Sequence, residues 1–568
     1  MSGSNYDKYP ATKFSGTIIK GWKNIAKTLK QLKYPLFIET YTGINENEIV
    51  DALNEICPGK MISTRELMKD EEEILRMTQP YMTEDFLFGF VTALKMEDYF
   101  NRDKLSEAKK NEKSIVIGPG ASLLAEEGDS IIYIDMARWE IQQRMRSHSV
   151  QALGVDNRKE PVSIQYKRGY FNDWRILDRH KSTLFHKVKY WIDTHIPTEP
   201  VMVDYDTFMK GVNLTASKPF RVVPFFDPAP WGGQWMKEKC DLDKTRSNFG
   251  WCFDCVPEEN SLYFEINGER FEMPSVNLIL LKSLEVLGEP VEARFGKDFP
   301  IRFDFLDTVE GGNLSLQVHP TTDFIKNEFG LNYTQDESYY LLDAKDGATV
   351  YIGLKKGADK EKMFQELREA QEKGISFDVE KHVNRIPAKK HDHFLIPGGT
   401  IHCSGAGSLV LEISSTPNIF TFKLYDWQRL GLDGKPRPIN IDRGEKVINF
   451  TRNTDYVEKY LHNCIELIEK GDGWNEERTG LHRNEFIETR RHWFTKPVLH
   501  NTNNSVNVLN LIEGEEAIVE SPEGKFDPFV VHYAETFIVP ACVGDYKISP
   551  YGKSMGKECA TIKARVRV

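Results

Sequence analysis

The sequence lacks several features that would assign it to a class at once. No apolar run is long enough to cross a membrane, and the first eight residues have no apolar core of the kind found in signal peptides. The eight cysteines are scattered through 568 residues, which is not the pattern of a disulfide framework. The net charge of −11 argues against nucleic acid or an anionic membrane as a partner. We therefore expect a cytoplasmic protein with neither of these partners, and its oligomeric state stays open.

The chain is also too long for one hydrophobic core, because single cores stop growing at about 250–300 residues. Its 40% hydrophobic and 28% charged content is typical of a soluble globular protein. We expect an α/β domain over 1–215, a metal-binding domain over 216–445, a helical insert over 446–497 and a C-terminal β-sandwich lobe over 498–568. The insert is predicted because Val457, Leu461, Ile465 and Ile468 recur at helical spacing.

In the first 215 residues, short apolar runs alternate with helical patterns. The runs 34–39, 113–118 and 130–135 predict strands of a parallel sheet built from βαβ units. This layout resembles the P-loop nucleoside kinases, but a working phosphate-binding loop is missing. Such a loop needs Gly-x-x-x-x-Gly-Lys-Ser/Thr, whereas the chain has Glu39-Thr-Tyr-Thr-Gly43-Ile-Asn-Glu46. We expect a degenerate kinase-like module that does not bind ATP in the usual way; an unrelated α/β domain is the alternative.

A combination of polar residues in the second half has the composition of a metal site. Residues 313–319 alternate as a strand does, so Gln317 and His319 would project from the same face. Glu337 begins a second strand-like run, and His402 follows a third run through a Gly-Gly turn. Three adjacent antiparallel strands would bring an amide, two imidazoles and a carboxylate together. This mixed set of ligands suits Zn²⁺ or a similar divalent ion.

The surrounding motifs resemble those of the type I mannose-6-phosphate isomerases (phosphomannose isomerases). They are Pro230-Trp-Gly-Gly233, Leu314-Ser-Leu-Gln-Val-His-Pro320, Glu337-Ser-Tyr-Tyr-Leu-Leu-Asp343, Pro397-Gly-Gly-Thr-Ile-His402 and Leu424-Tyr-Asp426. The resemblance extends from about residue 216 to the end of the sequence. It implies a mainly-β cupin or jelly-roll fold with one Zn²⁺ held by Gln317, His319, Glu337 and His402. It also implies a sugar-phosphate substrate, with mannose 6-phosphate and fructose 6-phosphate interconverted through a cis-enediol.

The resemblance also suggests which residues act on the substrate, with two departures from the family pattern. Lys423 stands where the family has a catalytic Arg, and Gln335 stands where it has a Lys. We assign catalytic roles to Lys423, Glu412 and Arg429, the last as a possible replacement for the missing guanidinium. Substrate-binding roles fall to Ser315, and to Lys435 and Arg437 for the phosphate, although a solvated basic turn would explain this pair equally well.

Two alternatives follow from these departures: a non-catalytic cupin-type sugar sensor, or an isomerase of a different aldose. Two further motifs have metal-like spacing. We interpret His391-Asp-His393 as a solvated turn and Cys252-Phe-Asp-Cys255 as a pair of packing residues.

Overall fold

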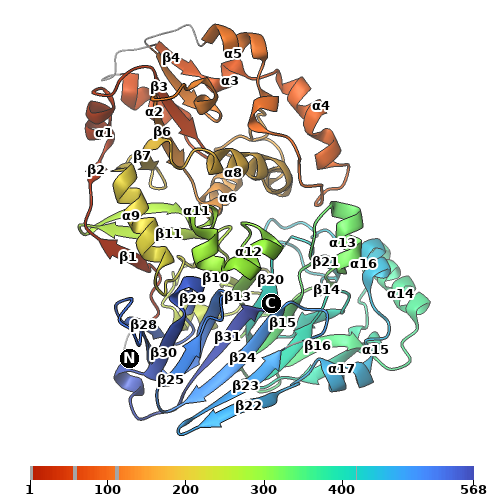
Figure 1. The fold of residues 1–568 in the computed structure, drawn as a ribbon. Helices are drawn as coiled ribbons and strands as arrows, with labels where there is room; N and C mark the ends of the chain where they lie inside the picture. Colours follow the sequence, from red (N-terminus) through yellow and green to blue (C-terminus); the bar gives the residue numbers. More distant parts are fainter. Residues whose placement is uncertain (1–3, 55–59, 109–113, 418, 481, 568) are drawn as a thin grey trace. The chain divides into compact units, whose positions relative to one another are not determined.

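The computed structural model describes residues 4–54, 60–108, 114–417, 419–480 and 482–567 (Figure 1). They form two compact units. The α/β unit comprises Ala11–Thr215 and Pro257–Lys282, and the β-rich unit comprises Met1–Pro10, Ala216–Val256 and Ser283–Val568.

A single sheet organises the α/β unit. In the described residues it has seven strands in the order β2-β8-β7-β6-β3-β5-β4. The strands are β2 (Ile18–Lys20), β3 (Leu36–Thr40), β4 (Lys60–Ser63), β5 (Ser114–Gly118), β6 (Ser130–Asp135), β7 (Val188–Asp193) and β8 (Val201–Asp204). Strands β4, β5, β3, β6 and β7 pair in parallel, which confirms the predicted parallel sheet, whereas β7–β8 and β8–β2 are antiparallel.

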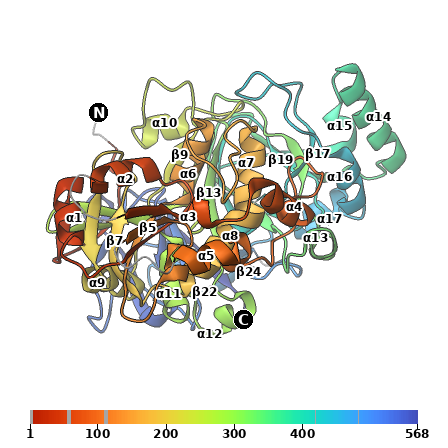
Figure 2. The ribbon, with the colours of Figure 1, turned by 90° about the horizontal axis from the view of Figure 1, so that it is seen from above.

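The two faces of this sheet are packed differently. On one face, aliphatic side chains of β3 such as Leu36 and Ile38 join those of α1 (Trp22–Leu29) and α2 (Glu46–Asn54) in one buried cluster. Figures 1 and 2 both draw these two helices as neighbours. The other face carries aromatic residues, where Trp191 stacks on Phe208 of α9 (Tyr205–Ala216) with ring centroids 4.3 Å apart. Burial on both faces explains why the strands are continuous apolar runs.

A second segment of the chain completes the α/β unit. Strand β1 (Ala11–Phe14) pairs with β11 (Ser261–Ile266), which pairs with β12 (Glu269–Pro274). The backbone N–H of Glu272 donates to Asp193 at 2.8 Å, and the Asn277 amide donates to Asp135 at 2.8 Å. The predicted boundary of the α/β domain at residue 215 therefore omits residues 257–282, which belong to the same unit. A cut at residue 215 would separate them from their partners.

Two facing sheets form the first part of the β-rich unit. One has the order β18-β15-β20-β13-β10-β9 and the other β17-β16-β19-β14-β21. The first contains β9 (Phe225–Asp227), β10 (Trp251–Cys255), β13 (Ile301–Asp307), β15 (Glu337–Ala344), β18 (His393–Ile396) and β20 (Ser408–Ser415). The second contains β14 (Leu316–Val318), β16 (Thr349–Leu354), β17 (Val383–Pro387), β19 (His402–Ser404) and β21 (Phe422–Tyr425).

Helices α13 (Thr322–Phe329), α14 (Lys360–Lys373), α15 (Val379–His382), α16 (Ile441–Val447) and α17 (Thr454–Tyr460) belong to the same part. Helices α14 and α16 lie side by side in both views of the ribbon (Figures 1 and 2). No helix in the described part of the chain is both long enough and apolar enough to span a membrane.

The remaining strands form a two-sheet lobe. Its sheets have the orders β22-β23-β24-β31-β26-β29 and β25-β30-β27-β28. The strands are β22 (Glu466–Gly471), β23 (Trp474–Gly480), β24 (Ile487–Phe494), β25 (Val498–Asn501), β26 (Asn507–Glu513), β27 (Glu516–Glu520), β28 (Phe529–His532), β29 (Thr536–Val539), β30 (Asp545–Pro550) and β31 (Cys559–Val566). Residues from both sheets pack into one buried apolar cluster.

The helical insert expected over 446–497 is wrong. Helical structure is confined to its first part and ends with α17, whose last residue is Tyr460, and Asn463 has a left-handed φ of 49°. Strands β22, β23 and β24 then follow in antiparallel succession, and β24 pairs with β31 along its whole length. The apolar spacing beyond Tyr460 belongs to exposed strand positions such as Leu467 and Ile468, so sheet pairing overrides the local pattern.

Candidate metal centre

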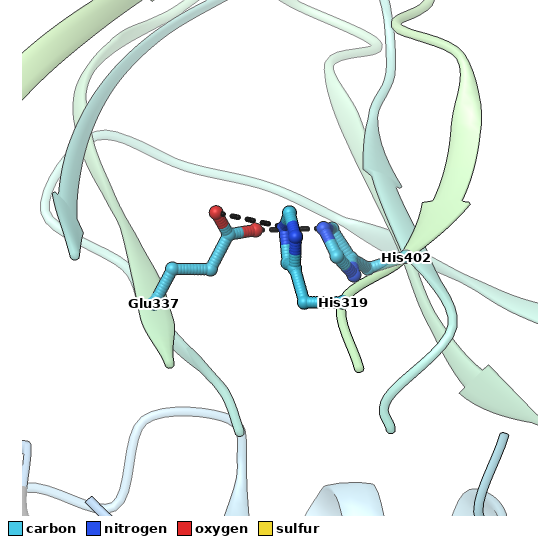
Figure 3. A group of neighbouring side chains, drawn as sticks. All are labelled: His319, Glu337 and His402. Carbon is cyan, nitrogen blue, oxygen red and sulfur yellow. Dashed lines mark ion pairs between the residues drawn. The ribbon is translucent and has the colours of Figure 1, made fainter. Parts of the chain in front are cut away.

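The predicted ligands lie where the two facing sheets of the β-rich unit approach each other. Gln317 on β14 pairs directly with His402 on β19, and His319 follows β14 on the same face. Glu337 begins β15 in the opposite sheet and points toward both imidazoles (Figure 3). Three strands from two sheets thus bring together residues that are far apart in the sequence.

The group is compact and closed to solvent. The Nε2 atom of His402 lies 2.6 Å from Oε1 of Glu337, and Nε2 of His319 lies 3.2 Å from Oε2. One ligand atom from each of these residues falls within 4.8 Å of the others, and all three residues are buried. The Gln317 side chain lies beside this group, with its amide Nε2 3.3 Å from Nε2 of His402.

The hydrogen bonds outside this group orient the two imidazoles toward its centre. Nδ1 of His319 donates to the carbonyl of Phe420 at 3.1 Å, and Nδ1 of His402 donates to the carbonyl of Thr400 at 2.8 Å. Each ring therefore directs its Nε2 atom toward Glu337, the orientation in which metal-binding histidines hold their coordinating nitrogen. Among the described residues, Nε2 of His319 and Oε1 of Glu337 have no hydrogen-bond partner apart from these imidazole–carboxylate pairs. Two imidazole nitrogens and a carboxylate, with the Gln317 amide beside them, fit a divalent metal such as Zn²⁺.

The electrostatics of the group reflect this mutual orientation. Burial alone would raise the pKa of Glu337, but the two neighbouring histidines hold it well below the usual range. Burial lowers the pKa of His319, and the Glu337 carboxylate outweighs it, so that the net shift is upward. The Glu337 carboxylate is therefore kept ionised, with two imidazole rings facing it. A metal cation can bind to such a group in place of protons.

The turn that carries His402 depends on a residue that the sequence did not reveal. The buried guanidinium of Arg452 donates to the carbonyls of Pro397 and Gly398 at 2.6 and 2.7 Å and to the hydroxyl of Thr400 at 2.5 Å. Arg452 lies in the segment expected to be a helical insert, and no motif surrounds it. Only the tertiary contact shows that it holds the Pro397–His402 turn in place.

Lys423 lies beside the ligands. It pairs with Gln317 across β21 and β14, so Lys423, Gln317 and His402 follow one another across three strands. Burial, and secondarily the charge of Arg437, lowers the pKa of Lys423 to about 8. Within the described ranges its ammonium makes no hydrogen bond or ion pair.

A second polar group adjoins the ligands along β14. Asp426 binds the guanidinium groups of Arg429, at 3.1 Å, and of Arg437, and it accepts a hydrogen bond from Ser315 at 2.9 Å. Two cations share one carboxylate, so the cluster keeps a positive charge, and both arginines are about one-fifth exposed. Lys435 lies in an exposed turn, outside this cluster.

Glu412 lies on β20 beside Tyr339 and is buried. The Gln335 amide donates to Oε1 of Glu412 and to Oε2 of Glu337, both at 3.2 Å. Burial, reinforced by the charge of Glu337, raises the pKa of Glu412 well above its usual range. Arg302 lies 4.0 Å from Glu412 and 3.1 Å from Asp304.

The two metal-like spacings outside this centre have different outcomes. The interpretation of His391 and His393 as a solvated turn is wrong for His393, which begins β18 and is fully buried. His391 is partly covered and contacts Tyr340 and Glu513. Cys252 and Cys255 are both buried, unbridged residues of β10, as expected of packing residues.

A solved structure has a similar fold over part of this chain. The crystal structure of mannose 6-phosphate isomerase from Bacillus subtilis matches 61% of this chain and 100% of its own, with a TM-score of 0.50 and 19% identity. At this identity the likeness concerns the fold alone.

Sequence comparison adds the relationship. A probable mannose-6-phosphate isomerase of Bacillus subtilis (strain 168) is 27% identical over 230 residues, which are 40% of this chain and 68% of that protein. The mannose-6-phosphate isomerase of Streptococcus mutans is 26% identical over 234 residues, 41% of this chain and 68% of its own. About 40% of the chain is thus homologous to mannose-6-phosphate isomerases. A family model described as a domain of unknown function (DUF8485) matches residues 21–217, and this description names no activity for that region.

Proposed function

We propose that the chain is a zinc-dependent aldose–ketose isomerase that interconverts mannose 6-phosphate and fructose 6-phosphate through a cis-enediol. The observation that carries this proposal is the convergence of His319, Glu337 and His402, each oriented as a ligand, next to an unpaired ammonium and a cationic cluster. The homology to isomerases of this specificity supports it.

Each part of the site has a role in this reaction. Isomerisation moves a proton from C2 to C1 of the aldose and a second proton from O2 to O1. A divalent metal would supply fixed positive charge near the two oxygens. Glu412, the second carboxyl group beside the ligands, carries the proton between C2 and C1. Lys423 stabilises the negative charge that develops on the oxygens of the enediol.

The phosphate binds to the neighbouring cluster. Arg437 and Arg429 share the single carboxylate of Asp426, so a phosphate gains charge-assisted hydrogen bonds there without displacing every internal partner. The hydroxyl of Ser315 lies in the same cluster, accepting from Arg437 at 2.9 Å. Lys435 contributes at most at long range, because its turn is exposed.

The test is a coupled assay of the metal-loaded protein against phosphorylated and free aldoses. We expect turnover of mannose 6-phosphate, and of free mannose only at far higher concentration. Turnover of a different aldose phosphate would support the proposed reaction type but show that the proposed substrate is wrong.

A sugar sensor is the second candidate, because Lys423 and Gln335 replace two residues of the family pattern. Binding of mannose 6-phosphate by calorimetry, without conversion after long incubation with excess protein and metal, would favour the sensor and reject the isomerase.

A further inference from the structure

A short segment before β15 connects the three parts of the chain that carry the ligands. The hydroxyl of Thr334 donates to the carbonyl of Pro320, which follows His319, at 2.6 Å. Two residues later, Asp336 accepts from the backbone N–H of Gly398, in the turn before His402, at 2.7 Å. The backbone on each side of Gln335 is thereby fixed to both histidine-bearing segments.

Gln335 reaches from this segment to two carboxylates. Its side chain is buried, and its Nε2 donates to Glu337 and to Glu412 at 3.2 Å each. Its Oε1 has no partner in the described part of the chain. The orientation of the amide therefore rests on its two bonds to carboxylates, and these bonds in turn fix where the carboxylates point.

Within the proposed isomerase, we propose that Gln335 is a positioning residue: its amide braces the metal ligand Glu337 and the proton carrier Glu412 in one fixed relation. The Glu337 carboxylate would then already have the orientation that metal binding requires, and the Glu412 carboxyl group would stay next to Glu337. The bracing group is uncharged, so the positive charge near Glu412 comes from Arg302 and would come also from a bound metal. Hydrogen-bond partners of ligands typically change metal affinity by about 10–100-fold when removed.

Two substitutions separate bracing from simple packing. Gln335→Leu preserves an apolar stem of similar size and removes both donors. Gln335→Lys keeps donors directed at the two carboxylates but places a charge in a buried position. If the residue only fills space, Leu is tolerated and Lys is harmful. If it braces the carboxylates, Lys preserves the function and Leu does not.

The experiment titrates metal-free wild-type and variant full-length proteins with Zn²⁺ by calorimetry, and with Co²⁺ by visible absorption, which reports the ligand geometry. We expect Gln335→Leu to weaken Zn²⁺ binding about tenfold or more and to alter the Co²⁺ spectrum. Gln335→Lys should bind Zn²⁺ within about threefold of wild type. Thermal unfolding of the metal-free proteins checks that each variant is folded.

A Gln335→Leu protein with wild-type Zn²⁺ affinity and Co²⁺ spectrum would overturn the inference, as would a Gln335→Lys protein that is folded yet no better than Leu. These outcomes are distinct from failure of the proposed function. Wild-type protein that binds Zn²⁺ but converts no sugar would reject the isomerase while leaving the bracing role to be decided by the variants' affinities.

Discussion

The two units of this protein both gather charged side chains at strand ends, but they use them differently. At two strand ends of the α/β unit the charges are matched internally. Lys181 binds Asp135 at 3.0 Å, and the buried carboxylate of Glu39, at the end of β3, accepts from the backbone N–H groups of Gly120 and Ser122 at 2.6 and 2.8 Å. In the β-rich unit, the inner nitrogens of His319 and His402 both face the single carboxylate of Glu337, and no other described cation neutralises this group.

This difference teaches how to tell a binding centre from a structural charge network. Buried polar groups are normally satisfied within the protein. Where backbone carbonyls hold the outer nitrogens of His319 and His402 and direct both inner nitrogens toward one buried carboxylate, a metal ligand is expected. Where a carboxylate such as Glu39 already fills the donors of a turn, an anionic ligand would have to displace it.

The largest expected effect comes from removing a ligand of the metal centre. His402→Ala should abolish Zn²⁺ binding, measured by elemental analysis, and lower kcat/KM about a thousandfold or more, because the fixed positive charge is lost. His186→Ala, which removes a histidine of the α/β unit that contacts Tyr205, is the matched control and should keep full metal content. Full occupancy in His402→Ala would end the metal hypothesis.

In the α/β unit the corresponding change should affect stability. Lys181→Met leaves Asp135 buried without its ammonium partner and should lower the free energy of unfolding of that unit by about 3–5 kcal/mol, measured by urea denaturation. The exposed pair of Lys356 and Asp455 provides the control, since Lys356→Met should leave the free energy of unfolding close to that of the wild type. Equal costs in the two variants would contradict the internal role of this network.

Within the β-rich unit, Lys423 and Arg429 are expected to differ in the kinetic constant that each affects. Lys423→Met should lower kcat about a hundredfold, as expected when a cation that stabilises the transition state is removed. Arg429→Met should mainly raise KM, because Arg429 belongs to the cluster around Asp426. Steady-state kinetics separates the two. Near wild-type kcat in Lys423→Met beside an inactive Arg429→Met would reverse the assignment.

His393 gives a smaller, pH-dependent effect. Burial, with Arg491 adding to it, lowers the pKa of His393 to about 3, below its unfolded value of about 6.5. The unfolded chain binds more protons in this window, so the stabilising contribution is complete above about pH 6.5 and is lost as the pH falls toward 3. His393→Phe should remove about 2 kcal/mol of the stability change between pH 7 and pH 5, measured by denaturation at each pH. An unchanged pH profile would show that the ring is not held neutral.

For the α/β unit we expect no binding of ATP. The loop after β3 has no phosphate-binding lysine, and the Glu39 carboxylate occupies nearby backbone donors, so calorimetry with Mg·ATP should give no heat of binding. Micromolar binding would make a bifunctional kinase–isomerase the leading interpretation.

The sequence was most informative where the local pattern and the tertiary environment agree. Strands β3, β5 and β6 are buried on both faces, so their continuous apolar runs could be recognised. The strand carrying Gln317 alternates because its two faces differ, which placed Gln317 and His319 on one side. The prediction of a helix after Tyr460 failed because the apolar residues of this segment are exposed on strands, where their spacing carries no information about burial.

By itself the sequence determined which residue types are available for a metal and in what order the strands carry them. The tertiary structure alone decided which sheet faces Glu337, how Arg452 holds the turn before His402, and that Gln335 contacts two carboxylates 2 and 77 residues away. It also decided that residues 257–282 complete the α/β unit. Such contacts depend on sheet register and on packing between distant segments, and neither leaves a periodic signal in the chain.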